Sequence, residues 1–218
     1  MALVLNEEQR FLADTARDFL TAKAPVTEFR KLRDEHDSIG YSNALWQSMT
    51  ELGWASITLP EQHGGLDFGY LGLGTVLEET GRTLTASPLF STSVVGASTI
   101  LLGANEIQKE SILPRIANGS LTLALALEES HHHDPSSIAT KAIANGESFV
   151  INGRKTFVLD GHSADQLIVV ARTGGEHQKS RDGISLFLVD PASDGICIDR
   201  TSLVDSRNSA NITLNDVC

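Results

Sequence analysis

The sequence predicts an α+β protein of more than one domain, in which an all-helical domain is followed by an antiparallel β-barrel domain. Apolar residues recur at helical spacing up to about residue 120. From residue 121 they alternate with other residues at the period of two that is typical of strands. The pairs Asn145-Gly146 and Asn152-Gly153 are the residues that tight hairpin turns prefer. We therefore expect one domain over residues 1–120 and a second over residues 121–218.

The first predicted helix begins after Asn6, whose side chain can cap the helix, and Gln9 completes the pattern of a capping box. Further helices are predicted over residues 42–52, 70–82, 91–103 and 106–116. Residues 59–65 are predicted to form a loop, because a proline and paired glycines interrupt any helical period.

In the second half, leucines alternate with smaller residues over positions 121–127 and predict a first strand. The Asn-Gly pairs predict three short strands joined by tight turns, over residues 141–144, 148–151 and 155–159. Further strands are predicted over residues 167–171, 184–189, 196–199 and 210–214, with a polar loop over residues 174–183. Helices followed by a run of strands predict an antiparallel sheet or barrel.

Composition and charge exclude several classes of protein. The 218 residues are 41% hydrophobic and 21% charged, which is ordinary for a folded globular chain. The net charge of −11, from 17 basic and 28 acidic residues, repels phosphate backbones, so we expect no nucleic-acid partner. No apolar run approaches the roughly 20 residues that a membrane helix needs, so we expect no membrane insertion.

The cysteines and the N-terminal residues predict a cytoplasmic protein. Cys197 and Cys218 cannot form a disulfide framework and lack the spacing of metal ligands, which favours a reducing compartment. Glu7 and Glu8 stand where a signal peptide would be basic, so secretion is not expected.

Three adjacent histidines, residues 131–133, raise the question of a metal site. Metal ligands must converge on one point, whereas consecutive residues of an extended chain point to opposite sides. We therefore expect no metal, and we interpret these histidines as a loop or as the lining of a pocket.

Several short motifs follow one another in a defined order along the chain. They are Pro60-Glu61-Gln62-His63-Gly64-Gly65, residues 103–109, 113–119, 124–134 and 140–142, and Val150-Ile151-Asn152-Gly153-Arg154-Lys155. In order and spacing they resemble the N-terminal and middle domains of the acyl-CoA dehydrogenases. The resemblance implies an FAD-dependent oxidoreductase of fatty-acid or lipid catabolism. Such an enzyme introduces an α,β double bond into an acyl-CoA thioester and passes the electrons to an acceptor.

The resemblance also implies a subunit of three domains, of which this sequence covers the helical and β-barrel domains. The absent C-terminal helical domain would carry the glutamate that removes the substrate's α-proton, and half of the flavin pocket. We therefore expect no catalytic residue in this chain and no activity from the chain alone. Because the absent domain would cover apolar surface, we also expect a homo- or hetero-oligomer.

One wall of the flavin pocket is implied for the second domain. The FAD-binding residues that the resemblance implies are Leu127, Glu128, His133, Phe157, Val158 and Leu159. Phe157 can pack on the flavin ring as an aromatic plate. Leu127 and Leu159 stand where the family has hydroxyl side chains, and His133 stands where it has a small serine. We therefore expect weakened contacts with FAD.

Three interpretations of the function remain open. In the first, the full-length protein is an acyl-CoA dehydrogenase, or a related flavin oxidase or monooxygenase. In the second, it is a flavin-poor, non-catalytic partner subunit of a heteromer, which Leu127 and Leu159 favour. In the third, the chain is a truncated and inactive fragment. The sequence predicts neither the acyl chain length nor the electron acceptor.

Overall fold

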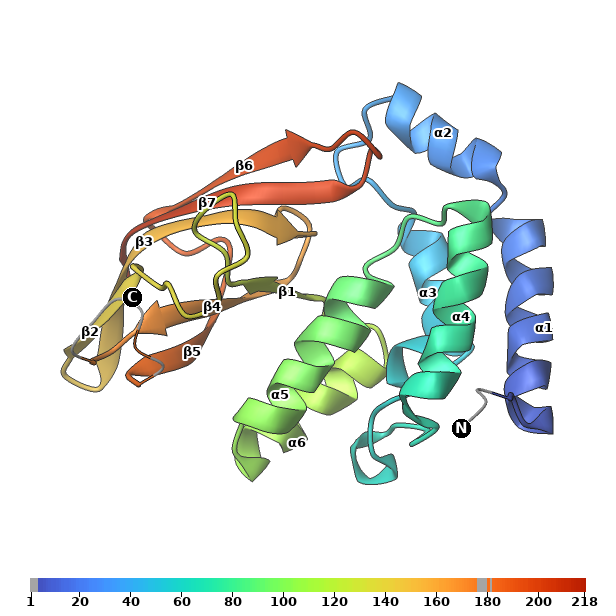
Figure 1. Cartoon of the computed structure of the whole chain (residues 1–218), viewed down its shortest axis with the longest axis horizontal. Helices are drawn as coiled ribbons and strands as arrows, with labels where there is room; N and C mark the ends of the chain where they lie inside the picture. Colours follow the sequence, from blue (N-terminus) through green and yellow to red (C-terminus); the bar gives the residue numbers. More distant parts are fainter. Residues whose placement is uncertain (1–3, 176–179, 181) are drawn as a thin grey trace. The chain divides into compact units, whose positions relative to one another are not determined.

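The computed structural model describes residues 4–175, 180 and 182–218, so the predicted polar loop over residues 174–183 lies partly outside the described residues. The chain forms two compact units, Met1–Ser120 and Leu121–Cys218 (Figure 1). The first unit is helical and the second contains a β-sheet. No helix of the described residues has both the length and the apolar character that crossing a bilayer requires.

The first unit contains three kinds of helix. Its α-helices are α1 (Glu7–Lys23), α2 (Val26–Asp34), α3 (Asn43–Glu51), α4 (Gly69–Thr83), α5 (Ala97–Gly103) and α6 (Glu106–Ala117). Its 3-10 turns are η1 (Trp54–Ser56) and η2 (Glu61–His63). A π-helix, η3 (Phe90–Gly96), runs directly into α5. The helix predicted over residues 91–103 is therefore part π-helix and part α-helix.

The predicted capping box at the start of α1 is confirmed. The backbone N–H of Gln9 donates to Asn6 Oδ1 over 2.8 Å, and the backbone N–H of Asn6 donates to Gln9 Oε1 over 3.0 Å. Asn105 and Gln108 form the same reciprocal pair at the start of α6. Each box satisfies two N–H groups that a helix start would otherwise leave unpaired.

Helix α2 was not expected from the sequence. This nine-residue helix contains no buried residue. Its apolar side chains Phe29 and Leu32 are only partly buried where they pack against the core of the unit. Three apolar residues, Val26, Phe29 and Leu32, on a charged segment of nine residues are too few to establish a helical period, so the helix depends on tertiary packing.

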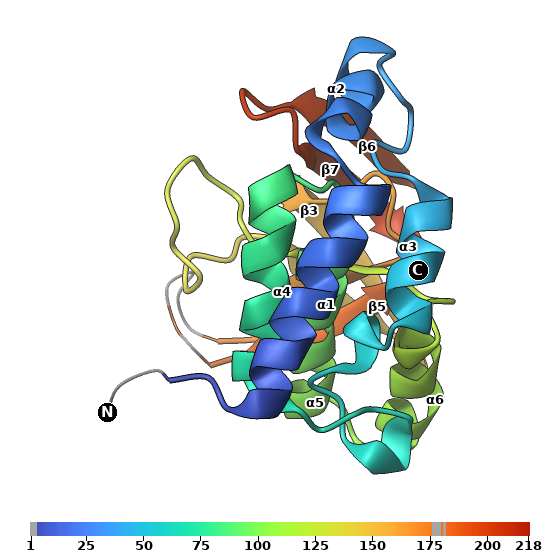
Figure 2. The ribbon, with the colours of Figure 1, turned by 90° about the vertical axis from the view of Figure 1, so that its right-hand side faces the viewer.

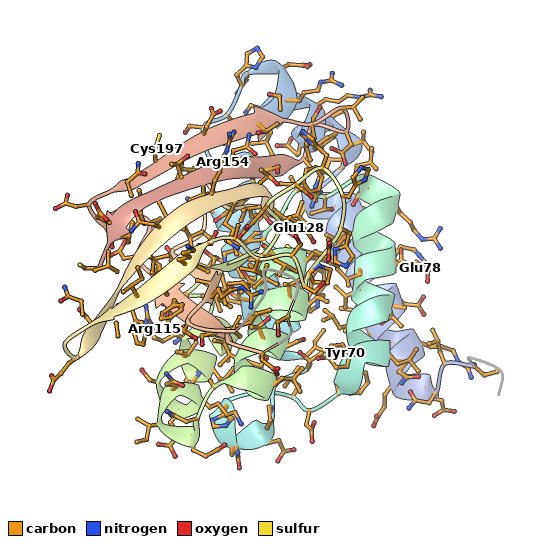
Figure 3. The ribbon with its side chains drawn as sticks, turned by 60° about the vertical axis from the view of Figure 1, so that its left-hand side comes forward. Tyr70, Glu78, Arg115, Glu128, Arg154 and Cys197 are labelled. Atoms are coloured by element: carbon orange, nitrogen blue, oxygen red, sulfur yellow. The ribbon has the colours of Figure 1, made fainter. Side chains whose placement is uncertain are left out.

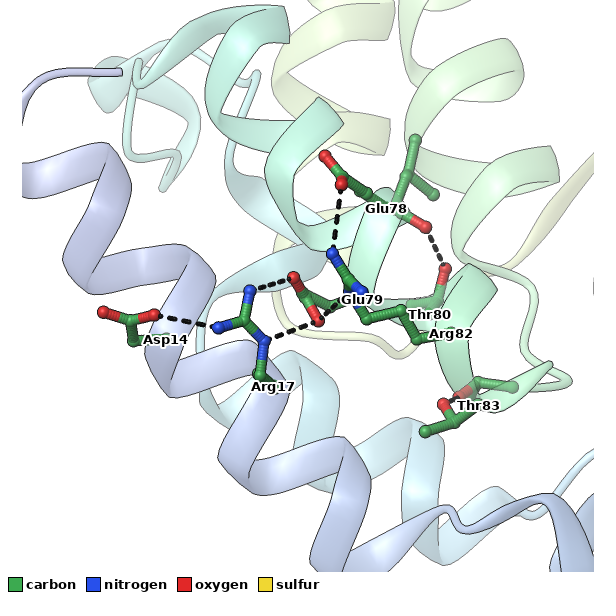
Figure 4. Close-up of polar contacts among 9 residues, drawn as sticks. Asp14, Arg17, Glu78, Glu79, Thr80, Arg82 and Thr83 are labelled. Carbon is green, nitrogen blue, oxygen red and sulfur yellow. Dashed lines mark hydrogen bonds and ion pairs between the residues drawn. The ribbon is translucent and has the colours of Figure 1, made fainter. Parts of the chain in front are cut away.

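A buried carboxylate joins α1 to α4 (Figure 4). Glu79 on α4 accepts hydrogen bonds from Arg17 Nη2 over 2.8 Å and Arg17 Nε over 3.2 Å, and it lies 2.9 Å from Arg82 Nε. The hydrogen bond from Arg17 lowers the pKa of Glu79 below its ordinary value, against the opposing effect of burial and with further help from Arg82. Figure 2 shows α1 and α4 side by side, and Leu20 and Val76 from these helices share one apolar core.

The second unit contains a mixed sheet. Its strands are β1 (Leu123–Ala126), β2 (Lys141–Asn145), β3 (Ser148–Leu159), β4 (Gln166–Arg172), β5 (Ile184–Val189), β6 (Ile196–Ser202) and β7 (Asn208–Val217). Along the sheet they follow the order β1-β4-β2-β3-β7-β6, and β5 pairs with β4. The pairs β2–β3, β3–β7, β4–β5 and β6–β7 are antiparallel, whereas β1 and β2 each run parallel to β4.

The prediction of an antiparallel barrel is therefore wrong in two respects. β1 runs parallel to β4, with Leu123 opposite Gln166 and Ala126 opposite Val169. The sheet is also open, since β1 and β6 lie at opposite ends of the strand order. Alternation along the sequence identifies a strand but not the direction of its partner. The connection over residues 127–165 is long enough to return the chain in the same direction.

The two Asn-Gly pairs have different roles. At Asn145-Gly146 the chain turns from β2 into β3, as predicted, and Gly146 has a φ of +65°. At Asn152-Gly153 the chain does not turn, because β3 continues through both residues. There the pairing of β3 with β7 shifts register between Ile151 and Gly153. The prediction of a second turn is wrong because a β-bulge uses the conformational freedom of glycine just as a turn does.

Candidate functional site

A cavity of about 580 Å³ lies in the second unit, between strand residues and the segment that follows β1. We name residues 127–140 of that segment the strap. The cavity is lined by Glu128, Ser130, His131, His132, His133, Arg154, Thr156, Phe157, Thr201, Ser209 and Asn211. Figure 3 labels Glu128 on the strap and Arg154 on β3. The volume lies within the range that is usual for small-molecule sites.

Phe157 lines the cavity at an irregularity in β3. The register of β3 against β7 shifts between Lys155 and Val158, and Phe157 has a φ of +55°. The Phe157 side chain is 56% exposed, whereas Val158 is buried in the core of the sheet. A positive φ costs a bulky residue free energy, and such strained residues cluster at functional sites. The bulge therefore keeps an aromatic ring at the cavity that a regular strand would place differently.

A buried ion pair fastens the strap to β3. The side chain of Lys155 is fully buried, and its Nζ donates to Glu129 Oε1 over 2.6 Å and to the carbonyl oxygen of Leu127 over 3.1 Å. Glu129 also accepts hydrogen bonds from the backbone N–H groups of Ala139, over 2.6 Å, and Thr140, over 3.0 Å. One carboxylate and one ammonium group thus hold both ends of the strap.

Burial acts on the pKa of both members of this ion pair. Burial alone would raise the pKa of Glu129, but hydrogen bonds from Lys155, Thr140 and Ala139 outweigh it, so this pKa lies below its ordinary value. Burial lowers the pKa of Lys155, because the loss of water outweighs the attraction of Glu129 and Glu128. Each charge therefore depends on its partner, since a lone buried charge is costly.

His133 and Glu128 interact at the cavity. Their closest atoms, His133 Nδ1 and Glu128 Oε1, lie 2.5 Å apart, and the backbone N–H of Asp134 donates to Glu128 Oε2 over 3.4 Å. The backbone N–H of Thr156 donates to the carbonyl oxygen of Glu128 over 2.8 Å, so the strap and β3 also meet here. Within the part of the chain that the structure describes, no group of three or more His, Cys, Asp or Glu residues is arranged to hold a metal ion.

Strands β6 and β7 add polar residues that the sequence analysis did not single out. Thr201 on β6, and Ser209 and Asn211 on β7, line the cavity. Ser209 is fully buried, and its Oγ has no hydrogen-bond partner among the described residues. The available signal was the set of polar residues Asn208, Ser209 and Asn211 at the start of β7. It is weak, because only strand pairing brings these residues beside β3.

The predicted FAD-binding residues separate into two groups. Three of them line the cavity together: Glu128, His133 and Phe157. The other three are not among the residues that line it. Val158 belongs to the core of the sheet, while Leu127 and Leu159 are half-buried. Leu127 contributes its carbonyl oxygen, which accepts a hydrogen bond from Lys155.

Two family profiles match the chain. The profile described as "Acyl-CoA dehydrogenase, N-terminal domain" matches residues 6–120. The profile described as "Acyl-CoA dehydrogenase, middle domain" matches residues 124–217. Together they account for nearly all of the sequence.

A curated relative and two solved structures agree with these profiles. Cyclohex-1-ene-1-carbonyl-CoA dehydrogenase of Geobacter metallireducens is 34% identical over 217 residues, which cover 96% of this chain and 55% of the relative. A variant of the Tcur3481-Tcur3483 steroid ACAD superposes with a TM-score of 0.83 at 30% identity, over 97% of this chain and 55% of that one. Acyl-CoA dehydrogenase from Geobacillus kaustophilus superposes with a TM-score of 0.86 at 24% identity, over 100% of this chain and 57% of that one. The chain thus spans about half the length of the proteins that it matches.

Proposed function

This chain belongs to the acyl-CoA dehydrogenase family, and on that premise we propose that it forms the first two domains of an FAD-dependent oxidoreductase. The proposed reaction introduces an α,β double bond into an acyl-CoA thioester. The observation that carries the proposal is the match of both family domains in sequence order. A cavity that contains three of the predicted FAD-binding residues supports it further.

The cavity residues fit a flavin dinucleotide in three respects. Phe157 offers an exposed aromatic ring, against which a planar heteroaromatic ring can pack. Arg154 offers a positive charge for a phosphate-bearing ligand. Ser209 offers a buried hydroxyl without a partner in the described part of the chain. Leu127 and Leu159 offer no hydroxyl, which supports the proposal that the contacts are weaker than is usual in the family.

In the proposed mechanism, the residues of this chain bind and orient the cofactor. FAD, when bound, supplies the redox chemistry by accepting a hydride from the β-carbon of the substrate. Phe157 would pack against the ring of the cofactor, and Arg154 would offset the negative charge of its phosphates. Lys155 and Glu129 keep the strap in place, so the cavity retains its shape. We propose that the base that removes the α-proton lies outside residues 1–218.

The test is purification of the full-length protein that contains this chain. We expect a yellow protein that reduces an electron-accepting dye when acyl-CoA thioesters of different chain length are supplied. Phe157→Ala should lower the amount of bound flavin. Phe149→Ala is the matched control, because Phe149 is also exposed but packs against Phe187 and does not line the cavity. A colourless protein that takes up no FAD and reduces no dye would contradict the proposal.

A second candidate function is that of a non-catalytic partner subunit in a heteromer. Leu127 and Leu159 favour it, because neither side chain can donate a hydrogen bond to a flavin. The solved relative whose name joins Tcur3481 to Tcur3483 gives it further support. The two candidates are distinguished by purifying the full-length protein alone and together with an active relative. Flavin bound only in the joint preparation would favour the partner subunit.

We also propose that the full-length protein is a cytoplasmic homo- or hetero-oligomer that passes electrons to a separate acceptor. The use of cysteine supports this location, because Cys197 and Cys218 form no disulfide framework. Sedimentation of the full-length protein tests the oligomer, and a strictly monomeric profile at high concentration would contradict it.

A further inference from the structure

The lining of the cavity includes a buried hydroxyl group that forms no hydrogen bond with the residues that the structure describes. Ser209 lines the cavity and is 0% exposed. Its Oγ has no hydrogen-bond partner among the residues that the structure describes. A buried polar atom without a partner destabilises a protein, so each such atom in a folded chain requires an explanation.

The other hydroxyls of the cavity are already engaged within the chain. Ser130 Oγ donates to the carbonyl oxygen of His132 over 3.0 Å, and Thr156 Oγ1 donates to the carbonyl oxygen of Ser130 over 3.3 Å. Thr201 Oγ1 accepts a hydrogen bond from Asn211 Nδ2 over 3.4 Å. Ser209 therefore differs from these neighbours, because its Oγ forms no hydrogen bond within the described part of the chain.

The position of Ser209 in the sheet relates its hydroxyl to Leu159 on the neighbouring strand. Ser209 on β7 is the direct cross-strand partner of Leu159 on β3. Side chains that are directly opposite in an antiparallel pair have their Cβ atoms only about 4.5–5.5 Å apart. Leu159 is the position at which the sequence lacks an expected hydroxyl. A hydroxyl is thus present on the adjacent strand, beside the position where it was expected.

We propose that Ser209 is a ligand-binding residue that donates a hydrogen bond to the polar edge of the flavin and so replaces the hydroxyl absent at Leu159. This inference rests on the proposed function, because it requires a flavin in the cavity. It assigns to β7 a contact that the sequence analysis placed on β3. It also accounts for a buried hydroxyl that has no hydrogen-bond partner among the described residues.

The experiment compares the FAD affinity of full-length variants by titration of apoprotein, followed by flavin absorbance and fluorescence. We expect Ser209→Ala to weaken FAD binding about tenfold, which corresponds to the loss of one hydrogen bond. Ser93→Ala is the matched control, because Ser93 Oγ is also buried without a partner in the described part of the chain, but Ser93 is not among the residues that line the cavity. We expect the control to bind FAD as tightly as the parent.

A second measurement separates loss of binding from loss of folding. In the absence of FAD, neither alanine variant should lower the unfolding temperature, because neither hydroxyl has a hydrogen bond to lose among the described residues. A reduced unfolding temperature for ligand-free Ser209→Ala would show that the hydroxyl has a structural role, and would overturn the inference.

A third measurement tests whether a hydroxyl introduced at position 159 takes over the role of the Ser209 hydroxyl. Leu159→Thr should restore most of the FAD affinity that Ser209→Ala loses, and should improve the affinity of the parent by a smaller factor. Unchanged affinity in Ser209→Ala would overturn the inference while the proposed function stands. A parent protein that binds no FAD at any concentration would overturn the proposed function, and this inference with it.

Discussion

The ion pair of Lys155 and Glu129 shows how single residues determine the shape of the candidate site. Lys155 is fully buried and the side chain of Glu129 is 11% exposed, and the structure compensates the two charges with each other and with backbone groups of Leu127, Ala139 and Thr140. Removal of one partner would leave the other charge buried without compensation, which costs more than the complete pair contributes. The strap therefore depends on both residues.

We expect Glu129→Gln to lower the free energy of unfolding by about 3 kcal/mol, because the ammonium group of Lys155 loses its counter-charge. Urea unfolding at pH 7 provides the measurement. Glu106→Gln is the control, because Glu106 forms an exposed ion pair with Lys109 at 2.9 Å, and exposed pairs contribute little. The double variant Glu129→Gln with Lys155→Met should recover most of the lost stability, because it removes the buried ammonium group and keeps a side-chain oxygen for the N–H groups of Ala139 and Thr140. Equal losses in Glu129→Gln and Glu106→Gln would rule out this explanation.

At the scale of elements, the hairpin of β2 and β3 contains two glycines with different roles. Gly146 has a φ of +65° in the hairpin turn, and a Cβ at this position would meet no atom within 4 Å. Gly153 lies beside the register shift with β7, and a Cβ there would approach the Thr140 Cα to 2.7 Å. The first glycine therefore serves the backbone conformation alone, whereas the second also allows the strap to approach β3.

These two glycines give a paired prediction. We expect Gly146→Ala to destabilise the protein by about 1 kcal/mol, through the positive φ alone. Gly153→Ala should cost about 2–3 kcal/mol, because the strap must also move away from β3. Urea unfolding measures both effects. Hydrogen exchange should report faster opening of residues 127–140 only in Gly153→Ala, and an equal response in both variants would refute the close approach.

The contact of Glu79 with Arg17, which is the joint between α1 and α4, predicts that stability depends on pH. The pKa of Glu79 is lower in the folded chain than its ordinary value of 4.5, because Arg17 donates a hydrogen bond to the carboxylate. The contribution of Glu79 is therefore fully present above about pH 4.5, and it is lost as the pH falls through the lower pKa of the folded state.

We expect Glu79→Gln to be less stable than the parent at pH 7, and the difference to shrink as the pH falls below about 4.5. Urea unfolding of both proteins between about pH 3 and pH 7 measures it. Glu78→Gln is the control, because the exposed Glu78 pairs with Arg82 over 3.3 Å outside the buried joint. A difference for Glu79→Gln that stays constant with pH would contradict the assignment.

At the scale of the whole molecule, the chain contains both matched family domains but about half the length of the relatives. We expect the 218-residue chain alone to reduce no acceptor with any acyl-CoA, and to bind little flavin. One wall of a pocket leaves most of the ligand surface in water, and small-molecule sites usually bury most of it. Dye reduction and flavin absorbance, measured beside the full-length protein, test this expectation. Turnover by the chain alone would contradict it.

The sequence by itself determined the features that depend on neighbouring residues. The capping box of Asn6 and Gln9, the hairpin at Asn145-Gly146 and the change from helical to strand periodicity all arise from local backbone preferences. The ordered motifs also carried the resemblance to the family, which the two profiles confirm.

Only the tertiary structure decided which distant residues meet. It placed β1 parallel to β4, it bulged β3 at Phe157, and it paired Leu159 with Ser209 across β3 and β7. It also buried Lys155 against Glu129, although 25 residues separate them in the sequence (residues 130–154). Strand direction, register and the pairing of buried charges depend on packing between segments that are far apart in the chain. Local periodicity carries no information about such packing, because every partner strand offers the same backbone hydrogen bonds.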